Sequence, residues 1–418
     1  MRTRYATAVA AASLLALSAC SSGGGSADGS GEVTLEWSFW SQGEAKDAMW
    51  QDLADKISKQ EDQVNVELNQ VPFANYFTKY QSQLAAGEAA CIVGMQSLRL
   101  PAFAETLNPM DDLLADAGFD EGSWVPGSLT ALQYEGEQYA VPIGFSTMRM
   151  FYNKDMFKAA GVPDPKDGWT IQQFVDAAQQ ITDETGDPAF GQSFSDLHMY
   201  SLLYAYNGAR PVTPEGTLDL TSTKMKEAFS WYTSLSTDLG VVSVPASSGD
   251  VPWGEQQFLA GNVAMAVDGS WNTVSNAANT DFDIGVVTLP VGTDGPHTYS
   301  ANSGFGISSN CEHKEDAASV IMTLTGEDSA KQAAENGAET ARTAENELYY
   351  KSISESIGKD YAKQAREVAK SAGEVATPFI STDNWDEVTK EMARQFLLAY
   401  TGDKDPVEAL TATQQAVS

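Results

Sequence analysis

The sequence has 418 residues, and its 57 acidic side chains outnumber 25 basic ones, which gives a formal net charge of −32. Such acidity argues against nucleic acid as a partner, because the phosphates would be repelled. The length exceeds what a single hydrophobic core can span, so at least two lobes or domains are expected.

Residues 1–20 have the pattern of a lipoprotein signal. Two arginines precede an apolar stretch at 5–17, which is shorter than the ~20 residues that a membrane-spanning helix needs. Small side chains then precede Cys20, whose thiol would carry the lipid after cleavage; the alternative is an ordinary cleaved signal with an incidental cysteine. Glycine and serine dominate 21–32 and indicate a flexible tether. We therefore expect a protein anchored by lipid on the extracytoplasmic face of the cell membrane.

Strand and helix patterns alternate along the first part of the chain. Residues 32–39 alternate apolar and polar side chains as a half-buried strand does, and residues 45–59 carry apolar side chains at helical spacing. The same two patterns return at 64–71 and 76–86, and a third strand is expected at 90–95. This order predicts an α/β lobe in which the ends of the strands face a cleft.

The rest of the chain predicts a second lobe of the same class. The expected elements are a hairpin at 135–142, an extended run at 143–152, a helix at 169–182, a mostly helical region at 199–240, strands at 262–267, 283–289 and 304–308, and a largely helical remainder from 314 onward. Thr170 is the expected N-cap of the helix at 169–182. The fold class predicted for the whole chain is α/β.

Six segments in a fixed order carry a resemblance to a known family. They are YAVPI at 139–143, MFYNKDMFKAAG at 150–161, WTIQQF at 169–174, FLAGNVAMAVDGSW at 258–271, GVVTLP at 285–290 and SGFGIS at 303–308. Together they resemble the family 1 extracellular solute-binding proteins of ABC importers, the group that includes maltose-binding protein. The chain departs from that pattern near Cys91, where relatives usually carry Pro-Asp, and before Arg342, where they carry Pro-Ala-Arg.

The resemblance implies a two-lobed periplasmic-binding-protein-like fold of type II. Each lobe would be a sheet flanked by helices, with the ligand cleft between the lobes. The resemblance maps lobe I onto 33–144 and 303–347, and lobe II onto 147–298 and 348–418. In that mapping, antiparallel strands of one sheet bring Cys91 close to Cys311, and the two would form a disulfide or remain buried free thiols.

The function implied by the resemblance is capture of a carbohydrate, either an oligosaccharide or a sugar derivative. A monomer without cofactor or metal would deliver this ligand to the transmembrane subunits of an ABC permease. Two alternatives remain. One is the same fold binding a non-sugar solute, either a polyol phosphate, which few basic residues in the cleft region argue against, or an osmolyte such as a quaternary ammonium, held by cation–π contacts. The other is an exported glycoside hydrolase. Motifs of serine hydrolases, zinc proteases and P-loop enzymes are absent from the sequence, which favours a binding protein.

Sugar recognition needs flat aromatic faces for the C–H side of a ring, and polar groups for its hydroxyls. Position along the implied fold selects the candidate ligand-binding residues. They are Trp40, Gln42 and Glu44 after the first strand; Gln96, Ser97 and Arg99 after the third; Phe145 and Ser146 on a strand that crosses between the lobes; and His198, Tyr206, Trp253, Trp271, Ser303, Gly304, Arg342 and Trp385 in segments that the resemblance brings to the cleft.

Several candidates have a structural alternative. Trp40 could be a packed core aromatic, and Glu44 could be a carboxylate that the dipole at a helix N-terminus favours. Arg99 could form a surface ion pair instead of binding hydroxyls. Trp253 could cover an apolar edge, and Trp385 could fill the space between helices.

Overall fold

The computed structural model describes residues 33–60, 63–125 and 127–418. The predicted signal with Cys20 and the predicted tether at 21–32 therefore lie outside the described residues. Within the described part, no helix combines the length and the apolar character needed to cross a membrane.

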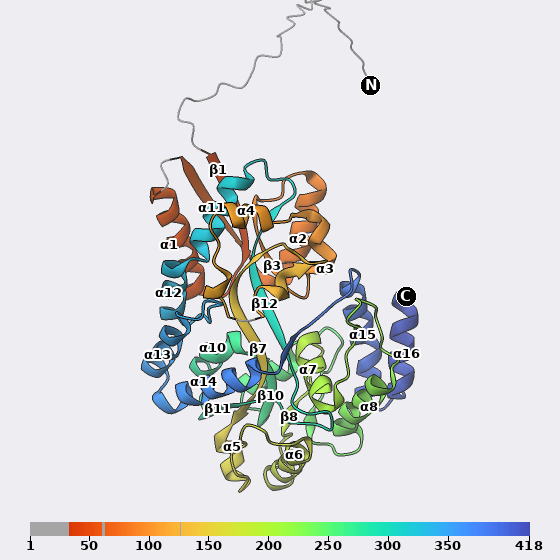
Figure 1. Ribbon diagram of the computed structural model, residues 1–418. Coiled ribbons are helices and arrows are strands. Elements are labelled where there is room, and N and C mark those ends of the chain that lie inside the picture. Colours follow the sequence, from red (N-terminus) through yellow and green to blue (C-terminus); the bar gives the residue numbers. More distant parts are fainter. Residues whose placement is uncertain (1–32, 61–62, 126) are drawn as a thin grey trace, which may run out of the picture.

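Two α/β lobes share one long mixed sheet, whose strand order is β2-β1-β3-β12-β7-β10-β8-β9. Lobe I is built on β1 (Val33–Trp40), β2 (Val64–Val71), β3 (Ile92–Gln96) and β4 (Leu107–Asn108). Lobe II is built on β8 (Phe190–Gly191), β9 (Val242–Ser243), β10 (Met265–Gly269), β11 (Ile284–Val287) and β13 (Ala376–Pro378). In Figure 1 lobe I lies above lobe II. The predicted two-lobed α/β fold of type II is confirmed.

Two long strands run between the lobes, β7 (Val141–Asn153) and β12 (Thr298–Ser308). The first half of β7 pairs with β12, and its second half pairs with β10 and β11 of lobe II. Because one strand belongs to both halves of the sheet, backbone hydrogen bonds join the lobes at this crossing. The crossing forms the centre of the molecule in Figure 1.

Helices cover the sheet of lobe I. They are α1 (Glu44–Gln60), α2 (Phe73–Ala86), α3 (Leu100–Phe103), α4 (Asp111–Asp116), α11 (Lys314–Leu324) and α12 (Glu327–Glu335), with a small hairpin of β5 (Gln133–Tyr134) and β6 (Glu137–Gln138). The core between α1 and the sheet contains an aromatic cluster in which Trp37, Trp50 and Phe305 meet edge to face, with ring centroids 5.0–5.8 Å apart. This packing of a helical face against a strand face is what the sequence periods predicted.

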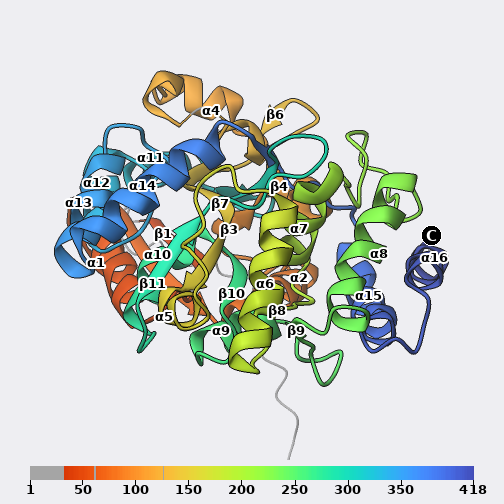
Figure 2. The same ribbon diagram turned by 90° about the horizontal axis from the view of Figure 1, so that it is seen from below.

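Lobe II carries the larger set of helices, which Figure 2 shows from below. They are α5 (Lys154–Ala159), α6 (Ile171–Thr185), α7 (Asp196–Asn207), α8 (Thr223–Thr237), α9 (Trp253–Leu259), α10 (Thr273–Ala278), α13 (Asn346–Ser356), α14 (Lys359–Gly373), α15 (Trp385–Tyr400) and α16 (Pro406–Val417). Thr170 caps α6 as predicted, within a capping box completed by Gln173. Gly208 ends α7 with a left-handed φ of 74°, so the region predicted as mostly helical at 199–240 is two helices with a loop between them.

Cys91 and Cys311 are disulfide-bonded, with their Cα atoms 4.6 Å apart. Cys91 directly precedes β3, and Cys311 follows the end of β12. The two strands are antiparallel, with Ile307 opposite Ile92, so the start of one lies beside the end of the other. The bond closes the end of the lobe I sheet that lies away from lobe II.

Candidate ligand-binding cleft

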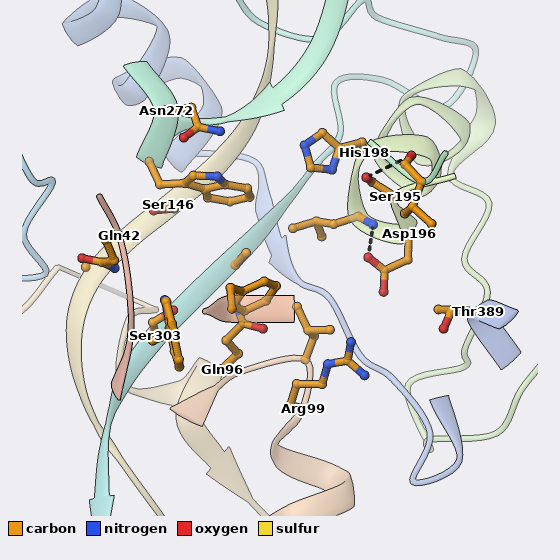
Figure 3. Close-up of a pocket in the computed structure, with 18 of the residues that line it drawn as sticks. Gln42, Gln96, Arg99, Ser146, Ser195, Asp196, His198, Asn272, Ser303 and Thr389 are labelled. Atoms are coloured by element: carbon orange, nitrogen blue, oxygen red, sulfur yellow. Dashed lines mark hydrogen bonds between the residues drawn. The ribbon is translucent and has the colours of Figure 1, made fainter. Parts of the chain in front are cut away.

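A cavity of about 860 Å³ lies between the lobes and is lined by residues of both. Its floor is the crossing, where Ser146 of β7 and Ser303 of β12 face the space. The walls come from the ends of lobe I strands and, in lobe II, from the start of α7, the middle of α15, the loop between β9 and α9, and the segment after β10. Figure 3 shows the labelled polar side chains of both lobes around this space.

Eight of the predicted ligand-binding residues line the cavity. They are Trp40, Gln42, Gln96, Arg99, Ser146, His198, Trp271 and Ser303. Trp40 combines both readings of its role, because only 5% of its surface is exposed and its ring packs against Phe73, Tyr76 and Phe77. Trp271 is the more accessible indole, and its edge contacts His198 at a centroid distance of 6.2 Å.

Four predicted residues of lobe I and the crossing do not line the cavity. Glu44 is exposed at the start of α1, where its charge suits the helix N-terminus. The hydroxyl of Ser97 accepts a hydrogen bond from the backbone of Asn302, at 3.1 Å. Phe145 faces the opposite side of β7 from Ser146, because side chains alternate along a strand. Gly304 is closed off by the Val141 carbonyl, which would lie 2.4 Å from any Cβ placed there.

Two predicted residues of lobe II pack against neighbours instead of lining the cavity. Tyr206 stacks on Trp231, with ring centroids 4.4 Å apart. The indole of Trp253 donates a hydrogen bond to Ser243 at 3.0 Å. The contacts of both rings therefore lie within lobe II, and neither ring lines the cavity.

Arg342 and Trp385 also lie outside the cavity. Arg342 rests over the Trp124 ring at 5.6 Å, donates to Glu345 at 3.3 Å, and borders a separate space of about 10 Å³. Trp385 is 1% exposed, and its indole donates to the carboxylate of Asp196 at 2.7 Å. Trp385 thus fills the space between helices and also orients a side chain that does line the cavity.

The cavity is also lined by side chains that were not predicted from the sequence. The most informative are Lys46, Phe73, Asp196, Asn272 and Glu339. Lys46 and Phe73 follow the first and second strands, so the strand-end argument used for Trp40 would have found them. Glu339 had no such signal, because it lies in an irregular segment far along the chain from the residues that it contacts.

Glu339 connects the lobes at the floor of the cavity. Its carboxylate accepts hydrogen bonds from Ser270 of lobe II and from Ser146 on the crossing strand, the latter at 3.4 Å. Burial raises the pKa of Glu339, although Arg149 and the serine contacts oppose that rise. Burial likewise lowers the pKa of Lys46, against the attraction of Glu339. The charges of Lys46 and Glu339 therefore attract each other, and both side chains line the cavity.

His198 belongs to a charged cluster in the lobe II wall. Its Nε2 lies 3.1 Å from Oε1 of Glu255 and 3.1 Å from Oδ1 of Asp268. Burial disfavours the imidazolium, but these two carboxylates outweigh it and raise the pKa of His198 to about 9. Asp268 also accepts hydrogen bonds from the amide of Asn272, at 3.0 and 3.1 Å, which fixes that lining side chain. Among the residues that the structure describes, no His, Cys, Asp and Glu are grouped so as to hold a metal ion.

The loop after β3 docks on lobe II. Arg99 forms an ion pair with Asp386 at the start of α15, and the Leu98 carbonyl accepts a hydrogen bond from Ser381. The Leu98 side chain is buried within the core cluster of lobe II. Arg99 both lines the cavity and forms an ion pair, so the two roles considered for it from the sequence are not exclusive.

Comparison with known proteins places this architecture in a family. A family model described as bacterial extracellular solute-binding protein matches residues 40–331. A binding protein of Brucella abortus is 25% identical over 270 residues, which cover 62% of this chain and 64% of that protein. The erythritol/L-threitol-binding protein of Mycolicibacterium smegmatis is 26% identical over 305 residues, covering 66% of this chain and 63% of the relative. The chain thus spans less than two thirds of the length of these curated relatives.

A solved structure shows the same fold. The ABC substrate-binding protein Lmo0181 from Listeria monocytogenes, in complex with cycloalternan, aligns with a TM-score of 0.80 and covers 92% of this chain and 98% of its own. Its sequence is 23% identical, so this likeness shows the fold alone. The family model, in contrast, matches more than half of the chain in sequence, which confirms the predicted resemblance. The chain belongs to the family of bacterial extracellular solute-binding proteins.

Proposed function

We propose that the protein binds a neutral carbohydrate between its lobes and delivers it to an ABC permease. The observation that carries this proposal is the chemistry of the cavity, which presents the indole of Trp271 together with hydrogen-bonding groups from both lobes. A sugar offers an apolar face to the ring and hydroxyls that both donate and accept. The two ligands named for the similar proteins above, erythritol or threitol and cycloalternan, are neutral polyhydroxy compounds.

Most of the basic side chains that line the cavity have a carboxylate nearby, which favours a neutral ligand. Arg99 is paired with Asp386, and the imidazolium of His198 is balanced by Glu255 and Asp268. Lys46 is attracted by the charge of the buried Glu339, although burial lowers the pKa of the lysine. An anionic ligand would have to compete with these carboxylates for the cations, whereas hydroxyls can hydrogen-bond to both kinds of group.

Ligand capture is proposed to work through closure of the lobes about the crossing. Groups from both lobes reach the cavity, so a bound sugar stabilises the conformation in which both walls contact it. We propose that lobe I comprises 33–144 and 303–347, and that lobe II comprises 147–298 and 348–418. A monomer anchored through lipid on Cys20 would stay near its permease at high effective concentration.

A glycoside hydrolase is the weaker alternative. The cavity carboxylates of Asp196 and Glu339 are both engaged by protein donors, Trp385 for the first and Ser270 for the second. These hydrogen bonds give each carboxylate a structural role that requires no catalysis. The relatives matched above are binding proteins, which agrees with this assignment.

A thermal-shift screen tests the proposed function. Mono- and oligosaccharides, erythritol, glycine betaine and sn-glycerol 3-phosphate are added to the protein, and reducing ends are assayed in parallel. We expect a saccharide to raise the melting temperature with no new reducing ends, because a ligand that binds only the folded state stabilises it. A shift only with betaine or the phosphate would reject the carbohydrate, and release of reducing ends would identify a hydrolase.

A further inference from the structure

The helix α1 holds Gln42, which lines the cavity from the loop between β1 and α1 (Figure 3). The backbone N–H of Gln42 donates to Oδ1 of Asp47 at 2.7 Å, and its side-chain Oε1 accepts a hydrogen bond from Nε1 of Trp50 at 3.2 Å. The other carboxylate oxygen of Asp47 accepts from the hydroxyl of Ser41. Both the backbone and the side chain of Gln42 are therefore fixed by residues of the following helix.

The indole of Trp50 has an orientation set by the core of lobe I. Its ring meets Trp37, Phe39 and Phe305 edge to face, at centroid distances of 5.8, 5.7 and 5.6 Å. Only 3% of the residue is exposed, so Trp50 borders the cavity but offers a ligand almost no surface. Because three rings surround the indole, packing fixes the direction of its N–H.

The chemistry of the indole decides which end of the Gln42 amide faces Trp50. An indole N–H donates and cannot accept, so only the amide oxygen can be its partner. The two ends of a glutamine amide are nearly equal in size, and without such a partner either could face the cavity. With the oxygen engaged, Nε2 is directed away from Trp50, and no hydrogen bond among the described residues uses this nitrogen.

Gln42 therefore offers the cavity a hydrogen-bond donor. A ligand atom beside this amide must be an acceptor, which a hydroxyl, a ring oxygen or a glycosidic oxygen of a sugar can be. A quaternary ammonium has no lone pair and cannot accept a hydrogen bond. The orientation of this one amide thus favours a polyhydroxy ligand over such a cation.

We propose, building on the carbohydrate function above, that Trp50 is a positioning residue for ligand binding. Its indole N–H holds the oxygen of Gln42, so that Nε2 of Gln42 is already directed at an oxygen atom of the sugar before binding. Trp50 acts through Gln42 and not through its own contact with the ligand. Without the indole N–H, the amide can rotate, and ordering it on binding costs conformational entropy.

A double-mutant cycle tests whether Trp50 acts through Gln42. Affinity for glucose, maltose, mannose, mannobiose and erythritol is measured by calorimetry with Trp50→Phe, Gln42→Ala and the double variant. For a compound that binds, Trp50→Phe should weaken binding roughly three- to tenfold, and Gln42→Ala at least as much, because each loses the effect of one hydrogen bond. In the Gln42→Ala background, Trp50→Phe should weaken binding by no more than about twofold.

Trp37→Phe is the matched control. Trp37 belongs to the same aromatic cluster and is fully buried, and its N–H has no acceptor among the residues that the structure describes. Both substitutions shorten a core ring and should lower the melting temperature. Only Trp50→Phe should change affinity beyond about twofold. An equal loss of affinity in Trp37→Phe would reduce Trp50 to a core residue and overturn the proposal.

The hydrogen bond itself is measured without a ligand. In protein labelled with nitrogen-15 tryptophan, the indole signal of Trp50 is identified by its absence from Trp50→Phe. Gln42→Ala should shift this signal more than that of Trp37, and an unmoved signal overturns the proposal.

The outcomes separate the two proposals. Additive effects of Trp50→Phe and Gln42→Ala on a sugar that binds reject the role of Trp50 and leave the carbohydrate function standing. If the indole signal shifts but none of the five compounds binds, the carbohydrate function is rejected, and the role of Trp50 in sugar recognition is rejected with it.

Discussion

Arg99 of lobe I forms an ion pair with Asp386, the second residue of α15 in lobe II. The neighbouring Leu98 side chain is inserted into the lobe II core, so this contact joins the lobes at the cavity wall and away from the crossing strands. The Asp386 side chain is half exposed, which limits the contribution of the pair to a modest free energy that salt can screen.

Asp386→Asn should therefore weaken ligand affinity by a factor of roughly two to five, although Asp386 itself does not line the cavity. The variant loses a contact between the lobes, so its closed arrangement is less stable relative to the open one. Calorimetry at two salt concentrations checks this, because the wild-type affinity should fall with salt more than that of the variant. Glu387→Gln, an exposed change in the same helical turn, is the control, and an equal effect of both variants would contradict a specific role for the pair.

Trp40 and Trp271 should respond differently to truncation. Trp40→Ala removes a nearly buried ring from the lobe I core and should lower the unfolding free energy by ~3–5 kcal/mol. Trp271→Ala removes an accessible platform and should weaken sugar binding by at least roughly tenfold with a smaller loss of stability. Chemical denaturation and calorimetry separate the two effects. Unchanged affinity in Trp271→Ala would remove this residue from the site.

Stability should depend on pH through His198. Its pKa is raised to about 9 by Glu255 and Asp268, from an unfolded value near 6.5, so the folded state holds the proton more tightly. This contribution is fully present below pH ~6.5 and is lost as the pH rises through about 9, with a total of the order of 3 kcal/mol. Urea denaturation of wild type and His198→Gln between pH 6 and 10 measures it. If the unfolding free energy of the wild type fell with pH no more steeply than that of His198→Gln, the result would show that His198 is neutral in the folded protein.

The Cys91–Cys311 bond should stabilise lobe I. The cysteines are 220 residues apart in sequence, so the bond restricts a long loop of the unfolded chain. Cys91→Ser with Cys311→Ser should lower the unfolding free energy by ~2–5 kcal/mol and leave ligand affinity nearly unchanged, because neither residue lines the cavity. Melting curves of the double variant, and of wild type with and without reductant, measure the effect. If reductant left the melting temperature of the wild type unchanged, even though it can reach the bond in the unfolded chain, the result would argue that the two thiols are free.

Lipid attachment at Cys20 is tested in cells. Cys20→Ser should move the protein from the membrane fraction to the soluble extracytoplasmic fraction and abolish labelling with radioactive palmitate. Cys91→Ser is the matched control and should keep the label. Labelling of both variants alike would show that Cys20 is not the attachment site.

Much of the fold could be predicted from the sequence, because periodicity is local. The helix capped by Thr170 and the strands around β1 and β2 follow from side chains within a few positions of one another. The order of the family-like segments added the two-lobed arrangement. At the cleft, residues such as Trp40 and Gln96 were predictable because strand ends meet at one edge of a sheet.

Only the tertiary structure decided which aromatic and charged side chains reach the ligand space. Trp385 resembled a sugar platform, but its indole meets Asp196, 189 positions away, and is buried there. Glu339 carried no local signal, and its role at the floor arises from Ser146 and Ser270 on other segments. The environment of a side chain depends on contacts between distant parts of the chain, and local periodicity carries no information about those contacts. The sequence by itself thus determined the α/β lobes, whereas long-range packing decided that Phe73, and not Trp385, faces the cleft.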